Sequence, residues 1–181
     1  MNKIETKFKD AFLIEPMVFG DYRGFFMESY SKEKFKKLGF TMEFVQDNHS
    51  LSAKKGTLRG LHYQLAPKAQ TKLVRVTHGV IYDVIVDIRE NSPTYGQWEG
   101  FELSAENKLQ LLVPKGFAHG FVTLTDDVEV QYKVDEFFSA EHDRGIAWDD
   151  PDLSIDWGVE YPILSEKDIK HPNLNEVIIN F

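Results

Sequence analysis

The sequence predicts a mainly β protein, an antiparallel barrel or jelly roll with a few short helices. Up to about residue 135, short apolar or alternating runs follow one another closely, each bounded by Gly, Pro, Asn, Asp or Ser. This spacing is typical of antiparallel sandwiches and barrels. Aromatic residues make up 13% of the chain, with 14 Phe and 7 Tyr, which suits a β-rich core. The length of 181 residues fits one domain, so we expect residues 1–181 to form a single unit.

The strand pattern can be assigned segment by segment. The predicted strands are Phe12–Val18, Gly24–Tyr30, Phe44–His49, Leu58–Gln64, Lys72–Thr77, Val80–Ile88, Trp98–Leu103, Leu109–Val113, Gly120–Leu124 and Val128–Val134. A helix is predicted from Ser31, its N-cap, to Leu38, with Gly39 as the stop signal. The pattern loosens in the C-terminal tail. There we expect a helical turn from Ser165 and packing of the tail against the barrel, with its polar residues at the barrel mouth.

Composition and charge exclude several classes of function. The chain has no Cys, which excludes cysteine nucleophiles, thiolate metal sites and disulfides. A net charge of -8 argues against a nucleic-acid binder, because such proteins need a basic face. The first residues carry charges where a signal peptide needs an apolar run, and no stretch approaches the apolar length of a membrane span. We therefore expect a cytoplasmic protein without a membrane partner.

Two polar side chains share a strand face with apolar residues. In Val128–Val134 the period of two turns Tyr132 inward. Tyr132 is then either a core tyrosine with a satisfied hydroxyl or a general acid held in a dry barrel. Lys72 shares a face with Val74 and Val76 in the same way. It is either an edge lysine whose stem lies along the surface or a cation aimed at an anionic ligand or developing oxyanion.

The strand Leu58–Gln64 carries the candidate histidine. His62 shares its face with Leu58, Gly60 and Gln64 and can point into the barrel, whereas strict alternation sends Arg59 to the opposite face. A bulge at Gly60 would let Arg59 and His62 reach one pocket. On this evidence alone His62 is either a structural strand histidine or a catalytic group.

A metal centre is not expected, although the chain has six His. The segment from Pro114 to His119 resembles the second half of the cupin signature, whose Pro-x-Gly-x-x-His turn supplies one metal ligand. The first half fails, because cupin metal sites need a His-x-His pair and Gln64 stands where the second His is required. We therefore predict a metal-free site.

Asp168 has two interpretations. The segment Ser165-Glu166-Lys167-Asp168 has the spacing of a capping box, so Asp168 either caps a helix start or has a functional role. No Gly-x-Ser-x-Gly elbow and no phosphate-binding glycine loop occurs in the sequence, so serine-hydrolase and P-loop chemistry lack support.

Taken together, these segments resemble the dTDP-4-dehydrorhamnose 3,5-epimerase family, which has a cupin fold. The resemblance follows the chain in order over nearly its whole length. The matching blocks are Phe19 to Phe26, Phe44 to Ser50, Leu58 to Gln64, Gln70 to Arg75, Asp83 to Arg89, Gly96 to Trp98, Leu103 to Asn107, Pro114 to Phe121, Tyr132-Lys133 and Ser165 to Asp168.

The resemblance implies a role for each matching residue. His62 would be the base, Asp168 would orient it, Tyr132 would be the acid, and Lys72 would face the substrate oxygen on which charge builds. Asp143 stands where we expect a Glu. The residues expected to contact the nucleotide or sugar are Arg23, Glu28, Gln46, Asp47, Asn48, Arg59, Lys72, His119, Asp143 and Lys167.

The implied reaction explains why these groups are needed together. The expected substrate, dTDP-4-dehydro-6-deoxy-D-glucose, has a ketone at C4 that acidifies the protons on C3 and C5. A base, an acid and an oxyanion donor then suffice to invert both carbons without a cofactor. Arg23 and Arg59 suit the diphosphate, because the donor geometry of a guanidinium group matches phosphate oxygens. Without the resemblance, Arg23 would be interpreted as a solvent-exposed arginine in a turn. Phe25 or Phe26 is a candidate to stack on thymine.

The resemblance also implies an isomerase of dTDP-L-rhamnose biosynthesis that forms a homodimer and yields dTDP-4-dehydro-L-rhamnose. Three alternatives remain open. The first is a nucleotide-sugar epimerase that inverts only C3 or uses another nucleotide. The second is a non-catalytic sugar-binding cupin, and the third is a metal-dependent cupin oxygenase or isomerase.

Overall fold

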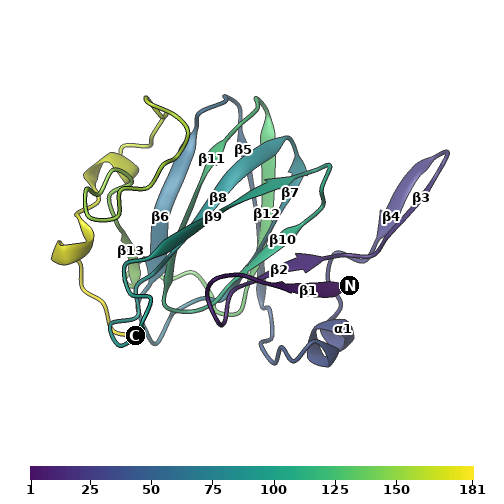
Figure 1. Cartoon of the computed structure of the whole chain (residues 1–181), viewed down its shortest axis with the longest axis horizontal. Coiled ribbons are helices and arrows are strands. Elements are labelled where there is room, and N and C mark those ends of the chain that lie inside the picture. Colours follow the sequence, from purple (N-terminus) through teal and green to yellow (C-terminus); the bar gives the residue numbers. More distant parts are fainter.

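Two antiparallel sheets face each other in the computed structural model, which describes residues 1–181 (Figure 1). The larger sheet is ordered β1 (Asn2–Glu5), β2 (Phe12–Glu15), β10 (Gln110–Val113), β7 (Lys72–His78), β12 (Val128–Val134) and β5 (Gln46–Ser52). The smaller sheet is ordered β13 (Asp143–Gly145), β6 (Leu58–Gln64), β11 (Phe117–Thr123), β8 (Val80–Asp87) and β9 (Trp98–Ser104). This sandwich is the cupin-type jelly roll that the sequence predicts.

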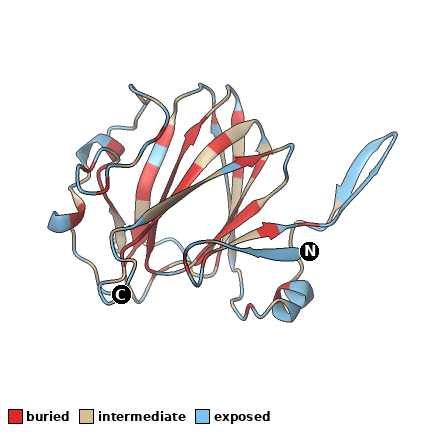
Figure 2. Cartoon of the chain, viewed as in Figure 1, coloured by how far each residue is buried: buried red, intermediate tan, exposed pale blue.

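Three groups of buried side chains hold these layers together (Figure 2). The first lies between the two sheets and includes Val74, Ile85 and Phe121. The second lies between the smaller sheet and the C-terminal tail, where Trp157 is 3% exposed. The third lies under helix α1 (Lys32–Lys37), which buries Phe35. The smaller sheet is therefore covered on both faces, whereas the larger sheet is covered on its outer face only where α1 packs.

Most of the predicted elements are confirmed. Leu58–Gln64 and Val128–Val134 are strands with the predicted bounds. Helix α1 begins after Ser31, whose side chain accepts a hydrogen bond from the Lys34 N–H, and Gly39 follows its C-cap with φ +93°. A positive φ there ends the helix, as glycine allows.

Some predicted bounds are wrong. The stretch Phe12–Val18 is not one strand, because Pro16 follows β2 and the chain turns into a separate hairpin, β3 (Val18–Asp21) and β4 (Gly24–Met27). The strand predicted at Phe44–His49 is shifted and runs as β5 to Ser52. The prediction missed β1 and β13, which are short and polar and take their place only by pairing with β2 and β6.

The tail contains two short 3-10 helices, η1 (Asp168–Lys170) and η2 (Leu174–Glu176). The predicted turn from Ser165 is confirmed, since the N–H of Ile169, the second residue of η1, donates to the Ser165 carbonyl oxygen at 3.2 Å. In Figure 1 the tail lies along the smaller sheet on the side of β6 and β13. No helix is long and apolar enough to cross a membrane.

Candidate active site

A cavity of about 460 Å³ opens beside β6, and we call it the His62 cavity. It collects side chains from both sheets and from the tail. Arg59 and His62 come from β6, Lys72 from β7, and Tyr132 from β12. The other predicted site residues that line it are His119, Lys167 and Asp168.

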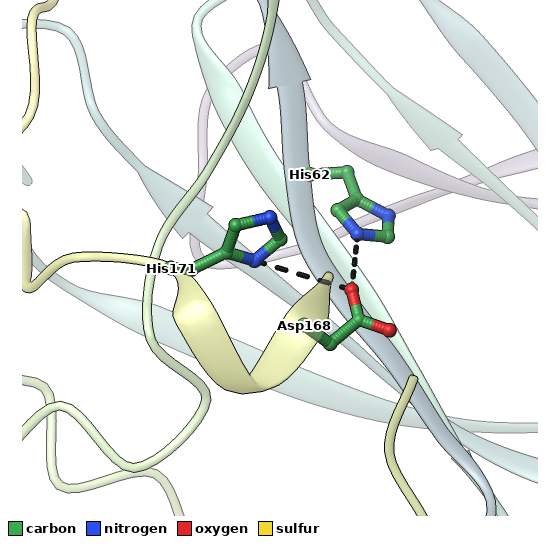
Figure 3. Close-up of side chains that lie close together, drawn as sticks. All are labelled: His62, Asp168 and His171. Carbon is green, nitrogen blue, oxygen red and sulfur yellow. Dashed lines mark hydrogen bonds and ion pairs between the residues drawn. The ribbon is translucent and has the colours of Figure 1, made fainter. Parts of the chain in front are cut away.

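His62 and Asp168 form a hydrogen-bonded pair at the wall of this cavity (Figure 3). The His62 Nε2 atom lies 2.6 Å from Asp168 Oδ1. The His62 side chain is 32% exposed, whereas that of Asp168 is 4% exposed. A carboxylate accepts only, so Nε2 carries the proton and Nδ1 keeps its lone pair. The imidazole therefore has one nitrogen available as a proton acceptor.

Ser165 fixes the carboxylate of Asp168. Its hydroxyl donates to Asp168 Oδ2 at 2.7 Å and accepts from the Asp168 N–H at 3.1 Å. Burial alone would raise the pKa of Asp168, but hydrogen bonds from His62 and Ser165 outweigh burial and lower it. Asp168 is therefore ionised at neutral pH. The two sequence interpretations of Asp168 are compatible, because the cap-like turn also aims its carboxylate.

Lys72 approaches His62 from the opposite sheet. Its ammonium donates to the His62 carbonyl oxygen at 3.4 Å. Burial lowers the pKa of Lys72 to about 8, although Asp143 and Asp83 act in the other direction. At pH 7 the side chain is therefore still cationic by roughly ten to one. The predicted inward face of β7 is confirmed, since Val74 and Val76 pack in the core between the sheets.

Tyr132 lies on the inner face of β12 and packs against the same core. Burial raises the pKa of Tyr132, an effect that Arg59 opposes and Asp143 reinforces. Its phenol therefore stays protonated at neutral pH and is a proton donor in the His62 cavity.

A bulge at Gly60 brings Arg59 and His62 to the same cavity, as predicted. Arg59 pairs with Phe121 and His62 pairs with His119, so three residues of advance along β6 correspond to only two along β11. Gly60 has φ +137°, and a Cβ there would lie 2.5 Å from the Gly120 Cα. Only glycine fits this close approach of the two strands. Arg59 is fixed by its Nε–H, which donates to Ser52 Oγ at 3.0 Å.

His119 lies deeper than His62. Its Nε2 lies 2.9 and 3.0 Å from the two carboxylate oxygens of Asp83, and both side chains are buried. Asp83 was not among the predicted site residues, and no short sequence motif identifies it as the partner of His119. Its signal is that Asp83 and Asp87 are the two charged residues in the otherwise apolar run Val80–Ile88, where an unpaired carboxylate would be costly.

The predicted β5 residues divide between the two faces of the larger sheet. Gln46 and Asn48 point inward and hydrogen-bond each other, with Nε2 to Oδ1 at 2.8 Å. Asp47 points outward, where it accepts a hydrogen bond from Lys133 at 2.7 Å. Asp47 and Asn48 line a second cavity of about 230 Å³. Asp143 lies on β13 and forms an ion pair with Lys167, beside the His62 cavity and not in its wall.

Arg23 and Glu28 lie away from the His62 cavity. Arg23 is at the turn between β3 and β4, and its guanidinium pairs with Asp21 on the same hairpin. Glu28 follows β4 and pairs with Lys34 of α1. The hairpin projects from the body of the molecule (Figure 1), and its Phe25 and Phe26 are 58% and 66% exposed.

One further histidine, His171, lies beside the His62–Asp168 pair and was not among the predicted site residues. The ring of His171 meets the His62 ring at 88°, with the centroids 5.3 Å apart. Its Nδ1 lies 3.9 Å from Asp168 Oδ1 (Figure 3). Burial lowers the pKa of His171, and the neighbouring His62 acts in the same direction. His171 lies in the irregular tail, where no strand or helix periodicity indicates which way a side chain points.

Comparison with known proteins gives one consistent result. The sequence profile of the dTDP-4-dehydrorhamnose 3,5-epimerase family matches residues 5–176. The dTDP-4-dehydrorhamnose 3,5-epimerase of Shigella flexneri is 56% identical over 170 residues, which cover 93% of each chain.

Two solved structures are similar over nearly their full length. The dTDP-4-dehydrorhamnose 3,5-epimerase of Bacillus anthracis with TDP and PPi bound is 60% identical, with a TM-score of 0.94 over 95% of this chain and 98% of that one. The dTDP-6-deoxy-D-glucose-3,5-epimerase of Legionella pneumophila in complex with dTDP-4-keto-L-rhamnose is 46% identical. Its TM-score is 0.93, over 98% of this chain and 94% of that one.

Proposed function

The chain belongs to the dTDP-4-dehydrorhamnose 3,5-epimerase family, and on this basis we propose that His62 is the base of the reaction and that Asp168, Tyr132 and Lys72 complete its machinery. The activity itself is that of a dTDP-4-dehydrorhamnose 3,5-epimerase, an isomerase of dTDP-L-rhamnose biosynthesis. The chain binds a dTDP-sugar. The observation that carries the proposed roles is the His62–Asp168 pair at the wall of a cavity that Lys72 and Tyr132 also line.

Proton removal falls to His62. Its Nε2–H is donated to Asp168, so the Nδ1 lone pair takes the proton from C3 or C5 of the keto sugar. The electron pair of the broken C–H bond moves onto the C4 oxygen as an enolate. The imidazolium that results carries a positive charge next to an ionised carboxylate, which stabilises it. Asp168 thus sets the tautomer of His62 before proton removal and stabilises the imidazolium charge of His62 after it.

Lys72 stabilises the enolate and Tyr132 protonates it. The Lys72 ammonium is aimed into the cavity by β7 and places a positive charge beside the C4 oxygen on which the negative charge develops. One such preorganised contact is worth roughly 2.7 to 4 kcal/mol in the transition state. Tyr132 returns a proton to the carbon from the face opposite to His62, which inverts that carbon. Both groups are protonated at neutral pH, as these roles demand: burial raises the pKa of Tyr132, and the pKa of Lys72, although lowered by burial to about 8, still lies above 7.

A homodimer would explain the projecting hairpin. Tyr22 at its tip is 97% exposed, and Phe19, Phe25 and Phe26 expose more than half of their surface. Apolar side chains gathered on an extended arm usually mark a surface that another chain covers. In the proposed dimer the β3–β4 hairpin lies against the partner subunit, so that Arg23 serves the diphosphate in the partner's cavity and a phenylalanine of the arm stacks on thymine.

Deuterium exchange tests the proposed roles. In D₂O the wild-type enzyme should incorporate deuterium at both C3 and C5 of dTDP-4-dehydro-6-deoxy-D-glucose, read by mass and by NMR position. The His62→Ala variant should keep its fold and lose exchange at both carbons. Tyr132→Phe should still exchange while product formation drops. Retained exchange in His62→Ala would remove His62 as the base, and exchange at C3 alone would favour a 3-epimerase.

A further inference from the structure

Three potential metal ligands lie together at the wall of the His62 cavity: His62, Asp168 and His171. Each offers one ligand atom, and all three atoms lie within 4.8 Å of one another. Two histidines and one carboxylate are a ligand set that suits Zn²⁺. Around a tetrahedral zinc with bonds of about 2.0 to 2.2 Å, ligand atoms sit roughly 3.3 Å apart. The separations of 2.6 Å and 3.9 Å between the histidines and Asp168 Oδ1 bracket that value.

His171 supplies a second, independent observation. Its side chain is 9% exposed, yet neither ring nitrogen has a hydrogen-bond partner. Buried polar atoms are rarely left without a partner, because an unmade hydrogen bond costs free energy. The ring occupies the space that a Cβ at position 145 would take, and Gly145 therefore permits its position. In Figure 3 the dashed lines from the two histidine rings meet at the same carboxylate oxygen of Asp168.

We propose that His62, Asp168 and His171 form a Zn²⁺ site that inhibits the enzyme. The ion would bind His62 Nε2, Asp168 Oδ1 and His171 Nδ1. Its fourth position faces the cavity, because His62 is the most exposed of the three ligands, and water can occupy it. The nearby Lys167 does not oppose the ion strongly, since Asp143 pairs with its ammonium.

Inhibition follows from the tautomer of His62. In the metal-free enzyme Nε2 carries the proton and Nδ1 is free to act as the base. When zinc binds Nε2, the neutral imidazole ring carries its proton on Nδ1. Nδ1 then has no lone pair with which to accept a proton from the substrate. This consequence rests on the proposed role of His62, whereas zinc binding itself does not.

Calorimetric titration of the full chain with Zn²⁺ in chelator-free buffer tests binding. The wild type should bind one ion per chain. His171→Ala should bind it at least about 100-fold more weakly, because even loss of an outer-shell partner of a metal ligand commonly costs 10- to 100-fold. His78→Ala is the matched control, since His78 is an exposed histidine bonded to the Asp127 carbonyl and should leave the titration unchanged. His171→Gln provides a second variant if circular dichroism shows that the alanine variant is misfolded.

Epimerase rates then test inhibition, each expressed against the same variant's own metal-free rate. Zn²⁺ should inhibit the wild type, EDTA should restore it, and the half-inhibiting concentration should rise by the same factor as the dissociation constant in His171→Ala. Mg²⁺, which prefers oxygen ligands, should not inhibit. The site is overturned if the wild type does not bind zinc, or if His171→Ala binds zinc as tightly as the wild type. Zinc bound through His171 without inhibition would support the site but overturn its inhibitory effect, and with it the role of His62 Nδ1 as the base.

Discussion

Lys72 on the larger sheet reaches across the sandwich and donates to the carbonyl oxygen of His62 on the smaller sheet, at 3.4 Å. The cation proposed for the enolate and the proposed base are thus positioned against each other by the two halves of the fold. Because burial lowers the pKa of Lys72 to about 8, the charge that this contact provides is sensitive to pH just above neutrality.

The turnover number should fall as pH rises above about 8. The Lys72 charge is fully present below its pKa and is lost above it, so stabilisation of the enolate is lost in the same range. Initial rates at saturating substrate between pH 6 and pH 10 check this. Lys72→Met should reduce kcat by roughly 10²- to 10³-fold. Lys72→Arg, which keeps its charge at high pH, should lack the alkaline fall, and an unchanged profile in that variant would contradict the assignment.

Asp168→Asn should lower kcat by roughly 10²- to 10⁴-fold with little change in melting temperature. The amide has no charge to stabilise the imidazolium and can hold His62 in the wrong tautomer. Steady-state kinetics with a thermal melt measure both effects. Asp149→Asn, at an exposed aspartate, is the control and should behave as wild type. Ser165→Ala should cause a smaller loss, about tenfold, since it removes the two hydrogen bonds between the Ser165 hydroxyl and Asp168 but leaves the carboxylate that pairs with His62.

Mixing two defective variants tests whether the hairpin serves the partner's site. His62→Ala and Arg23→Ala should each be impaired as homodimers. If Arg23 acts in the partner's cavity, a mixed dimer holds one doubly defective site and one intact site, so activity returns after the two are co-refolded or co-expressed. If Arg23 acts within its own subunit, both sites of the mixed dimer stay defective. No recovery in a mixture shown to contain mixed dimers would therefore reject the crossing arm.

Gly60→Ala should destabilise the fold by about 2 to 3 kcal/mol, which corresponds to a melting temperature lower by roughly 5 to 10 °C. The new methyl would meet the Gly120 backbone at 2.5 Å, and alanine at φ +137° is strained. Gly158→Ala is the matched control, because Gly158 also has a positive φ, +68°, but open space around it. Equal melting temperatures for the two variants would show that the close approach of β6 and β11 is not tightly packed.

The sequence determined which side chains face inward. On β12 and β7 the strict period of two directs Tyr132 and Lys72 to the interior, because successive side chains of a strand point to opposite faces. It also placed helix α1, since Ser31 and Gly39 act on their immediate neighbours. The Gly60 bulge could be anticipated as well, because a glycine between two site residues in a strand is a local signal.

Only the tertiary structure decided which of these side chains meet. Asp168 lies 106 residues from His62 in sequence, and only the docking of the tail on the smaller sheet brings them to 2.6 Å. His171 joins them through the same docking, and Asp83 meets His119 through the pairing of β8 with β11. Arg23, which the resemblance places among the substrate contacts, lies on the projecting β3–β4 hairpin and not in the wall of the His62 cavity. The physical reason is that strand periodicity is local, whereas sheet order and tail docking are set by burial summed over the whole chain.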